Sequence, residues 1–203
     1  AAVVNFKHQK SEEPKTNQLV AEYEDILKYN AAELKRINSP YGYVSMGSTM
    51  ICTVEAYISV GGMPKIKATE DFYFLQKLAK YTPIFNINEV LVYPSSRSEE
   101  RVYLGTGYRL KKQSSIKHLR IPKSKIKSIY FLYRVIEEVG FKDINSAIEQ
   151  IAKQDQTLYK FLYNHKIKNS MSLIIENSQS NEQFLKQFHR WFDNLKIYQF
   201  IKL

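Results

Sequence analysis

Cysteine is almost absent from this chain of 203 residues, since Cys52 is the only one. A single thiol excludes a disulfide framework and a zinc ribbon, and it fits a reducing compartment. Long apolar runs are absent as well: no stretch of 18 apolar residues occurs, so the sequence predicts no membrane-spanning helix. There is also no Gly-x-Ser-x-Gly element, which excludes the serine nucleophile elbow of the α/β-hydrolases.

Histidine is scarce and scattered, and no pair has metal-ligand spacing. We expect all four on the surface and assign no metal ligand among them: His8, His118, His165 and His189. Glu22, Glu24 and Asp25 form a short acidic cluster. Glu22 and Asp25 share a face of the helix expected there, and we interpret that face as solvated rather than as a metal site.

Positive charge is concentrated in the second half of the chain. Residues 1–100 carry 11 Lys and Arg against 12 Asp and Glu, whereas residues 101–203 carry 19 against 8. The formal net charge of +10 therefore comes entirely from the second half. Such an excess predicts a region that faces something anionic: a membrane surface, nucleic acid or polyphosphate groups.

The length and the start of the chain bear on its organisation. A chain of 203 residues can form one or two domains with their own cores. The first residues, Ala1-Ala2-Val3-Val4, contain neither an initiator methionine nor a signal-peptide pattern. We interpret this start as a cut made inside a longer protein.

Strands and helices are expected to alternate in the first half, where apolar residues recur at strand and helix spacings. Turn residues mark the limits of these elements, because Pro and Gly interrupt regular structure. The expected elements are a strand at 2–6, a loop with Pro14 at 7–16, a helix from Asn17 to about Ile37, a buried strand at 48–54 around Cys52, a short helix from Glu55 closed by Gly61-Gly62, a helix from Asp71, and short strands at 83–86 and 90–93.

From about Ser114 the pattern becomes helical, which predicts a small bundle with basic outer faces. One stripe ends at Gly140, and Asp143 or Asn145 is expected to cap the next helix. Further short helices are expected around Leu158–Tyr163 and Met171–Ile175. Ser180 then opens a helix whose apolar stripe we interpret as core packing rather than as a platform for bases: Phe184, Phe188, Trp191, Leu195 and Tyr198.

The candidate chemistry lies between Gly47 and Gly107. Asp71, in the sequence Thr69-Glu70-Asp71, stands where a helix begins and can serve as a general base for a hydroxyl group. Free backbone N–H groups at a helix start stabilise the anion, so we expect Asp71 to be ionised and a weak base. The alternative is that these three residues only cap the helix.

A second group of candidate residues follows in the loop 95–107. Arg97 and Arg101 carry guanidinium groups that match phosphate oxygens and can stabilise a departing diphosphate. The alternative is that both arginines pair with Glu99 and Glu100 on the surface.

This order of motifs resembles the acceptor-side half of the inverting GT-A glycosyltransferases of family 2, over roughly residues 1–112. The resemblance implies that Asp71 is the catalytic base, with Glu70 beside it. It also implies that the Gly-Gly turn and the arginine loop bind substrate, through Gly61, Gly62, Arg97, Arg101, Gly105 and Thr106. The arginine loop departs from the family's Gln-x-x-Arg-Trp-like wording, since no Trp follows.

The resemblance also implies parts that this sequence does not contain. In that family an Asp-x-Asp element on a nucleotide-binding half holds Mg²⁺ or Mn²⁺ against the donor diphosphate, and here the five aspartates are isolated. We therefore expect no metal site in the chain and no turnover by the chain alone. The expected partners are a nucleotide-sugar donor, a saccharide or lipid-linked saccharide acceptor and an anionic membrane surface, with no nucleic acid.

The resulting prediction is a helix-rich α/β chain in two parts. Residues 1–113 form an incomplete GT-A-like portion with few strands, and residues 114–203 form a basic helical bundle. We expect a cytoplasmic protein, peripheral at the inner face of a membrane. Two alternatives remain: a basic helical module that binds nucleic acid or an anionic membrane surface without catalysis, and a non-catalytic scaffold derived from the enzyme.

Overall fold

A computed structural model describes residues 1–96 and 116–203. The chain divides into two compact units, Ala1–Arg120 and Ile121–Leu203, which we call the N-terminal and the C-terminal unit. The domain boundary expected at residue 113 lies outside the described residues. In the described part the N-terminal unit combines a small sheet with helices and the C-terminal unit is helical, so the helix-rich α/β class is confirmed.

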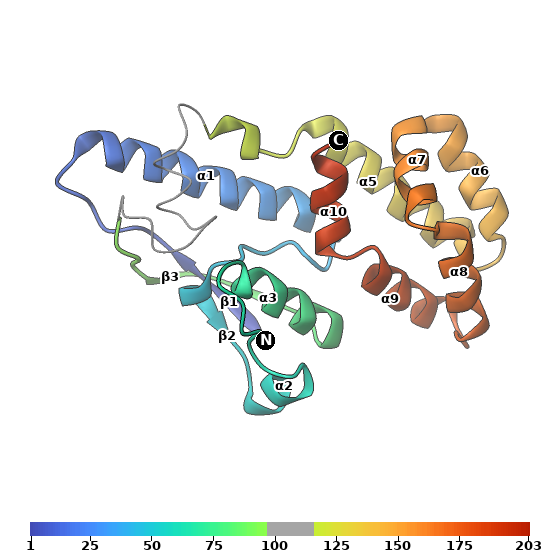
Figure 1. Ribbon diagram of the computed structural model, residues 1–203, viewed down its shortest axis with the longest axis horizontal. Coiled ribbons are helices and arrows are strands. Elements are labelled where there is room, and N and C mark those ends of the chain that lie inside the picture. Colours follow the sequence, from blue (N-terminus) through green and yellow to red (C-terminus); the bar gives the residue numbers. More distant parts are fainter. Residues whose placement is uncertain (97–115) are drawn as a thin grey trace. The chain divides into compact units, whose positions relative to one another are not determined.

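The sheet of the N-terminal unit has three strands in the order β2-β1-β3 (Figure 1). The central strand β1, Ala2–Phe6, runs antiparallel to β2, Met50–Ile51, and parallel to β3, Phe85–Val92. Val3, Val4 and Phe6 of β1 are buried, because the central strand is covered by its neighbours and by helices. The register between β1 and β3 shifts twice, so β3 bends relative to its partner.

Two strand predictions are wrong in this sheet. The buried strand expected at 48–54 is a 3-10 turn at Gly47–Thr49 followed by the two residues of β2, where Ile51 is half exposed. The two short strands expected at 83–86 and 90–93 are one strand, β3. The polar residues Asn86, Asn88 and Glu89 do not interrupt this strand, because part of it is exposed to solvent.

Helix α1, Pro14–Arg36, begins three residues before the expected start, with Pro14 inside its first turn. Proline is favourable at this position because the first helical N–H needs no partner. The helix ends with Asn38 in the left-handed conformation: the N–H of Ser39 donates to the carbonyl of Leu34 at 3.0 Å. Val20, Tyr23 and Ile26 of α1 pack with Ile116 in a buried cluster.

Helices α2, Val54–Ser59, and α3, Glu70–Tyr81, match the two helices expected from Glu55 and from Asp71. They lie against each other, and the rings of Tyr57 and Phe74 are 5.6 Å apart between centroids. Phe74, Leu75 and Leu78 of α3 are buried.

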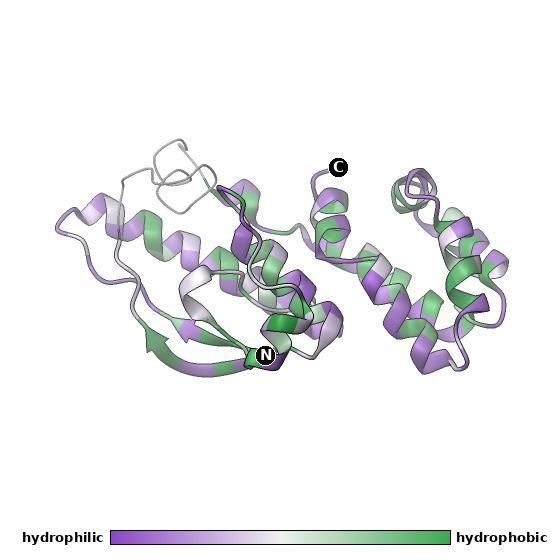
Figure 2. Ribbon diagram, turned by 60° about the horizontal axis from the view of Figure 1, so that its bottom comes forward, coloured by the Kyte–Doolittle hydropathy of each residue, from purple (hydrophilic) through white to green (hydrophobic). Residues whose placement is uncertain are grey.

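The C-terminal unit is a bundle of short helices that carry both hydrophobic and hydrophilic residues (Figure 2). Their buried side chains form an aromatic-rich core. The rings of Tyr133, Phe188 and Phe192 lie about 6 Å apart between centroids. Asp143 is the cap of its helix, one of the two residues expected there. The helices are α5, Lys123–Val135; α6, Ile144–Gln154; α7, Gln156–Asn164; α8, Ile167–Glu176; α9, Asn181–Trp191; and α10, Asn194–Ile201, with a π-helical turn, Ile136–Gly140, after α5.

The long helix expected from Ser180 to Tyr198 is wrong in one respect. Ser180 caps α9 as expected, but this helix ends at Trp191, and Phe192 separates it from α10. Asp193 then caps α10 by accepting a hydrogen bond from the N–H of Lys196 at 3.2 Å. The break turns Phe192, Ile197 and Phe200 into the core instead of the expected Leu195 and Tyr198.

No helix in the described residues is both long and apolar enough to cross a membrane.

Candidate functional site

Asp71 lies in the first turn of α3, and backbone groups of two separate segments hold its carboxylate. The N–H of Phe72 donates to Oδ1 at 2.7 Å. The N–H of Gly47, in the turn before β2, also hydrogen-bonds the carboxylate. An added Cβ on Gly47 would lie 3.9 Å from Cβ of Asp71. Backbone N–H groups therefore orient the carboxylate, and none of the described contacts is an ion pair with it.

Burial raises the pKa of the Asp71 carboxyl above its ordinary value near 3.8, and the negative charge of Glu70 adds to the rise. The hydrogen bonds from Phe72 and Gly47 lower the pKa but do not outweigh burial. The expectation that the helix start makes Asp71 a weaker base is therefore wrong, since loss of solvent dominates. A carboxylate with a raised pKa accepts a proton more readily.

The residue before α3 does not behave as an ordinary helix cap. Thr69 has φ 64° and ψ 16°, the left-handed conformation, and its side chain makes no capping hydrogen bond. Its Oγ1 donates instead to the carbonyl of Ala68 at 2.6 Å. A β-branched residue in this conformation is strained. Such strain persists only where the surroundings hold it, and it is common at active sites.

The register of the sheet places Asp71 at the edge where the parallel strands end. Phe6 of β1 is opposite Val92 of β3, so both strands finish there. Met50 of β2 is opposite Val3 and β2 runs antiparallel to β1, so the 3-10 turn Gly47–Thr49 before β2 lies toward the carboxyl end of β1, and it contacts that strand. Because Gly47 holds Asp71, the carboxylate lies on the same side of the sheet. Open α/β sheets bind ligands at the carboxyl ends of their parallel strands.

Residues 93–96, the last described before the arginines, are hydrogen-bonded to Gln9, three residues beyond the end of β1. The N–H of Gln9 donates to the carbonyl of Pro94 at 2.8 Å, and its side chain donates to the carbonyl of Tyr93 at 2.9 Å. Ser96 Oγ donates to the carbonyl of Gln9. Four of the predicted site residues lie outside the described residues: Arg97, Arg101, Gly105 and Thr106.

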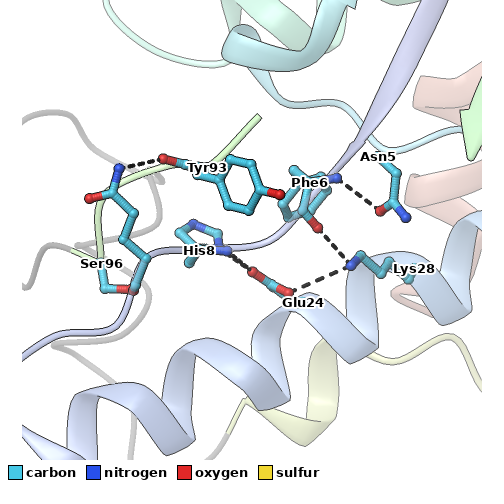
Figure 3. A network of polar contacts seen from close by, with 8 residues as sticks. Asn5, Phe6, His8, Glu24, Lys28, Tyr93 and Ser96 are labelled. Atoms are coloured by element: carbon cyan, nitrogen blue, oxygen red, sulfur yellow. Dashed lines mark hydrogen bonds and ion pairs between the residues drawn. The ribbon is translucent and has the colours of Figure 1, made fainter. Parts of the chain in front are cut away.

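A buried polar network supports the same edge from the side of α1 (Figure 3). The backbone N–H of His8 donates to Glu24 Oε1 at 2.5 Å, and His8 Nδ1 lies 2.6 Å from the same oxygen. Lys28 Nζ lies 3.6 Å from Glu24 Oε2 and donates to the carbonyl of Phe6 at 2.8 Å. Only 4% of the His8 side chain is exposed. The network fixes the end of β1 against α1.

Sequence analysis missed this network, and the expectation of surface histidines is wrong for two of the four. His8 pairs with Glu24, and His189 is enclosed by aromatic rings, 4.7 Å from the Tyr133 centroid. Burial lowers the pKa of His189 to about 4. The available signal was Glu24 itself, which falls on the apolar side of α1, whereas Asp25 is exposed as expected.

Gly61 and Gly62 close α2, as expected. Both have positive φ, 74° and 70°. The N–H of Gly62 donates to the carbonyl of Tyr57 and the N–H of Gly61 to that of Ile58, each at 2.9 Å, which is a Schellman motif. An added Cβ on Gly62 would lie 3.0 Å from the Tyr57 ring. Tyr57 contacts Phe74, one turn after Asp71, so the Gly-Gly turn lies beside α3 but does not touch the carboxylate in any described contact.

The described ranges, 1–96 and 116–203, contain no group of three or more His, Cys, Asp or Glu side chains arranged to hold a metal ion. The described residues therefore do not fit the Mg²⁺ or Mn²⁺ that the family resemblance implies, and no chemical step is derived through it.

Comparison with known proteins adds no relative to this description. No protein-family model, curated protein or solved structure matches the chain. The geometry around Asp71 is therefore the basis on which we infer a function.

Proposed function

We propose that this chain is the acceptor-side portion of an inverting glycosyltransferase in which Asp71 is the general base. The observation that carries the proposal is the environment of Asp71: a carboxylate at the carboxyl edge of a parallel strand pair, oriented by two backbone N–H groups, with a pKa raised by burial. These are the properties that a base for an acceptor hydroxyl requires.

The proposed reaction transfers a sugar from a nucleotide-sugar to the acceptor. The acceptor oxygen attacks the anomeric carbon of the donor from the face opposite the leaving group, and its proton passes to Asp71. The bond between the anomeric carbon and the diphosphate oxygen breaks, and the nucleoside diphosphate leaves with the electron pair. Arg97 and Arg101 are proposed to meet the charge that develops on the diphosphate. Glu70 is proposed to raise the proton affinity of Asp71.

The experiment compares two matched substitutions in the protein that joins this chain to a nucleotide-binding portion. Asp71→Asn keeps the shape of the side chain and removes the base, so transfer should fall about a hundredfold or more with donor affinity unchanged. Glu70→Gln removes a neighbouring charge only and should change transfer by about tenfold or less. Equal activity of the Asp71→Asn and native proteins would reduce Asp71 to a structural residue.

A second candidate is the basic binding module. Residues 121–203 contain 13 Lys and Arg and 8 Asp and Glu, a net charge of +5. Three of those acidic residues, Asp143, Asp155 and Asp193, accept backbone hydrogen bonds as helix caps, and the unit remains net positive with their charges counted. Binding of the chain to nucleic acid with strong salt dependence, together with unchanged transfer in Asp71→Asn, would favour this candidate.

A further inference from the structure

Helix α2 exposes aliphatic side chains to solvent instead of burying them. Ala56 is its only buried residue, while Val54 and Ile58, four positions apart on one face, are 76% and 69% exposed. Ile51, at the end of β2, is half exposed just before the helix. Exposed aliphatic residues gathered within eight positions mark an interaction surface rather than the scattered apolar residues of an ordinary surface.

Lysines follow the same helix in the sequence, and one of them contacts the residue after its end. Lys65 and Lys67 are exposed and flank Ile66, which is itself about half exposed, in the segment that follows the Gly-Gly turn. Lys77 of α3 is exposed and its Nζ donates to the carbonyl of Val60 at 3.5 Å, directly after α2. Aliphatic side chains and ammonium groups therefore occur together on and just after α2.

This combination fits a lipid interface better than a protein or nucleic-acid partner. Protein–protein interface cores are depleted in lysine, and single-stranded nucleic acid is bound by aromatic stacking and arginine. At a bilayer surface, aliphatic side chains enter the acyl boundary while lysines reach anionic headgroups. We name the surface of Ile51, Val54, Ile58, Lys65 and Lys67 the α2 surface.

We propose that the α2 surface docks on an anionic lipid bilayer, with Val54 and Ile58 inserted and Lys65 and Lys67 at the headgroups. Docking brings the candidate base to the lipid, because the Tyr57 ring of α2 contacts Phe74, one helical turn after Asp71. This further step rests on the proposed function: the acceptor hydroxyl is carried by a lipid at that interface rather than by a free sugar.

The test is co-sedimentation of the chain with vesicles of phosphatidylcholine alone and with vesicles in which about a third of the lipid is phosphatidylglycerol. The native chain should bind the anionic vesicles, and added salt should weaken the binding. Val54→Ser/Ile58→Ser should bind at least about a hundredfold more weakly, because two apolar side chains no longer enter the boundary. Lys65→Gln/Lys67→Gln should bind about thirtyfold more weakly.

Matched controls come from the C-terminal unit, where Tyr163 and Leu173 are also more than half exposed and Lys142 and Lys186 are exposed. Tyr163→Ser/Leu173→Ser and Lys142→Gln/Lys186→Gln should bind like the native chain. If a variant of the α2 surface and its control lose vesicle binding equally, binding depends on the overall charge or hydrophobicity of the chain, and the proposal is overturned. Absence of vesicle binding, or capture of the α2 surface by another protein segment instead, would overturn it as well.

The lipid-bound acceptor is tested separately from docking. In the transfer assay, α2 variants should keep activity on a water-soluble acceptor and lose it on one embedded in vesicles. If the native chain binds vesicles but Asp71→Asn leaves transfer unchanged, the proposed function is refuted and the docking proposal stands. If the native chain does not bind vesicles but Asp71→Asn abolishes transfer, the docking proposal is refuted and the proposed function stands.

Discussion

The two units of the chain differ in where they leave their large apolar side chains. In the C-terminal unit the aromatic residues gather inside, and Phe184, Phe188 and Phe192 are fully buried. In the N-terminal unit many large side chains stay on the outside, among them Val54, Phe85 and Leu91. Within the described residues the C-terminal unit leaves few large apolar side chains exposed, Tyr163 and Leu173 among them, whereas the N-terminal unit retains more exposed apolar surface that is available to a partner.

Helix starts do not separate the two units in the same way. The helices α6, α7, α9 and α10 each begin with a side chain that accepts a hydrogen bond from the first turn, and so does α2, through Thr53. No such cap is present at α1 and α3 in one unit or at α5 and α8 in the other, and Lys166 before α8 is left-handed like Thr69 before α3. Thr69 differs from Lys166 in being β-branched and in lying two residues before the candidate base, which is where strain bears on function.

The largest expected effect is in the aromatic core of the C-terminal unit. Phe188→Ala should lower the free energy of unfolding by about 3–5 kcal/mol, because it leaves a cavity between the rings of Tyr133 and Phe192. Trp191, the only tryptophan, lies 6.3 Å from Phe188 and reports this unit in urea unfolding. The exposed Tyr163→Ala should change stability by about 0.5 kcal/mol or less. Equal effects of the two substitutions would contradict the assignment of the core.

The next effect is a loss of stability in acid. The pKa of His189 is about 4 in the folded chain and near 6.5 when unfolded, so the unfolded state binds the proton first. Stability from this group is present above pH 6.5 and is lost as pH falls toward 4, by up to about 3 kcal/mol. Unfolding followed by Trp191 fluorescence across this range should show the loss. His189→Gln should flatten it, and an unchanged slope would assign the loss to other groups.

A smaller effect is expected at the turn after α2. Gly62→Ala should destabilise that turn by about 2 kcal/mol, since φ is positive and the new methyl meets the Tyr57 ring. Gly61→Ala also places a side chain at a positive φ, but the new methyl group meets open space, so we expect a destabilisation of about 1 kcal/mol. Hydrogen exchange of residues 54–62 measures both. A larger effect at Gly61 would mean that the Tyr57 contact is unimportant.

The smallest effect is a gain in stability at Thr69. Thr69→Gly relieves the left-handed strain and should raise the free energy of unfolding by at most about 1 kcal/mol, because glycine also loses more entropy on folding. If the strain positions Asp71, transfer should fall in the same variant. Asn38→Gly, at another left-handed position, is the control and should leave transfer unchanged. A Thr69→Gly protein with native activity would show that the strain has no catalytic role.

The sequence predicted the elements that follow local rules. Strand 2–6, the helix from Asp71, the Gly61-Gly62 cap and the Ser180 cap each depend on nearby residues, and the structure confirms them. The break at Phe192 was missed because the aromatic spacing continues across it, and only the tertiary core selects Phe192 over Trp191.

The candidate site was predictable in part. Thr69-Glu70-Asp71 was visible as a motif, but its partner Gly47 lies directly before residues 48–54, whose fold was misread as a strand. The raised pKa of Asp71 could not be predicted, because it results from burial by distant residues that outweighs the helix start. The pairing of His8 with Glu24 was missed for the same reason: contact between β1 and α1 is not local in sequence.

The central claim is that Asp71 is a base whose proton affinity is raised by burial, not a helix-capping carboxylate. The most direct measurement is an NMR titration of the side-chain carboxyl carbons of the chain, with the Asp71→Asn spectrum identifying the Asp71 signal. A midpoint above the ordinary value near 3.8 is the predicted result. A midpoint at or below that value would contradict the account, because a helix start that stabilises the anion would then dominate.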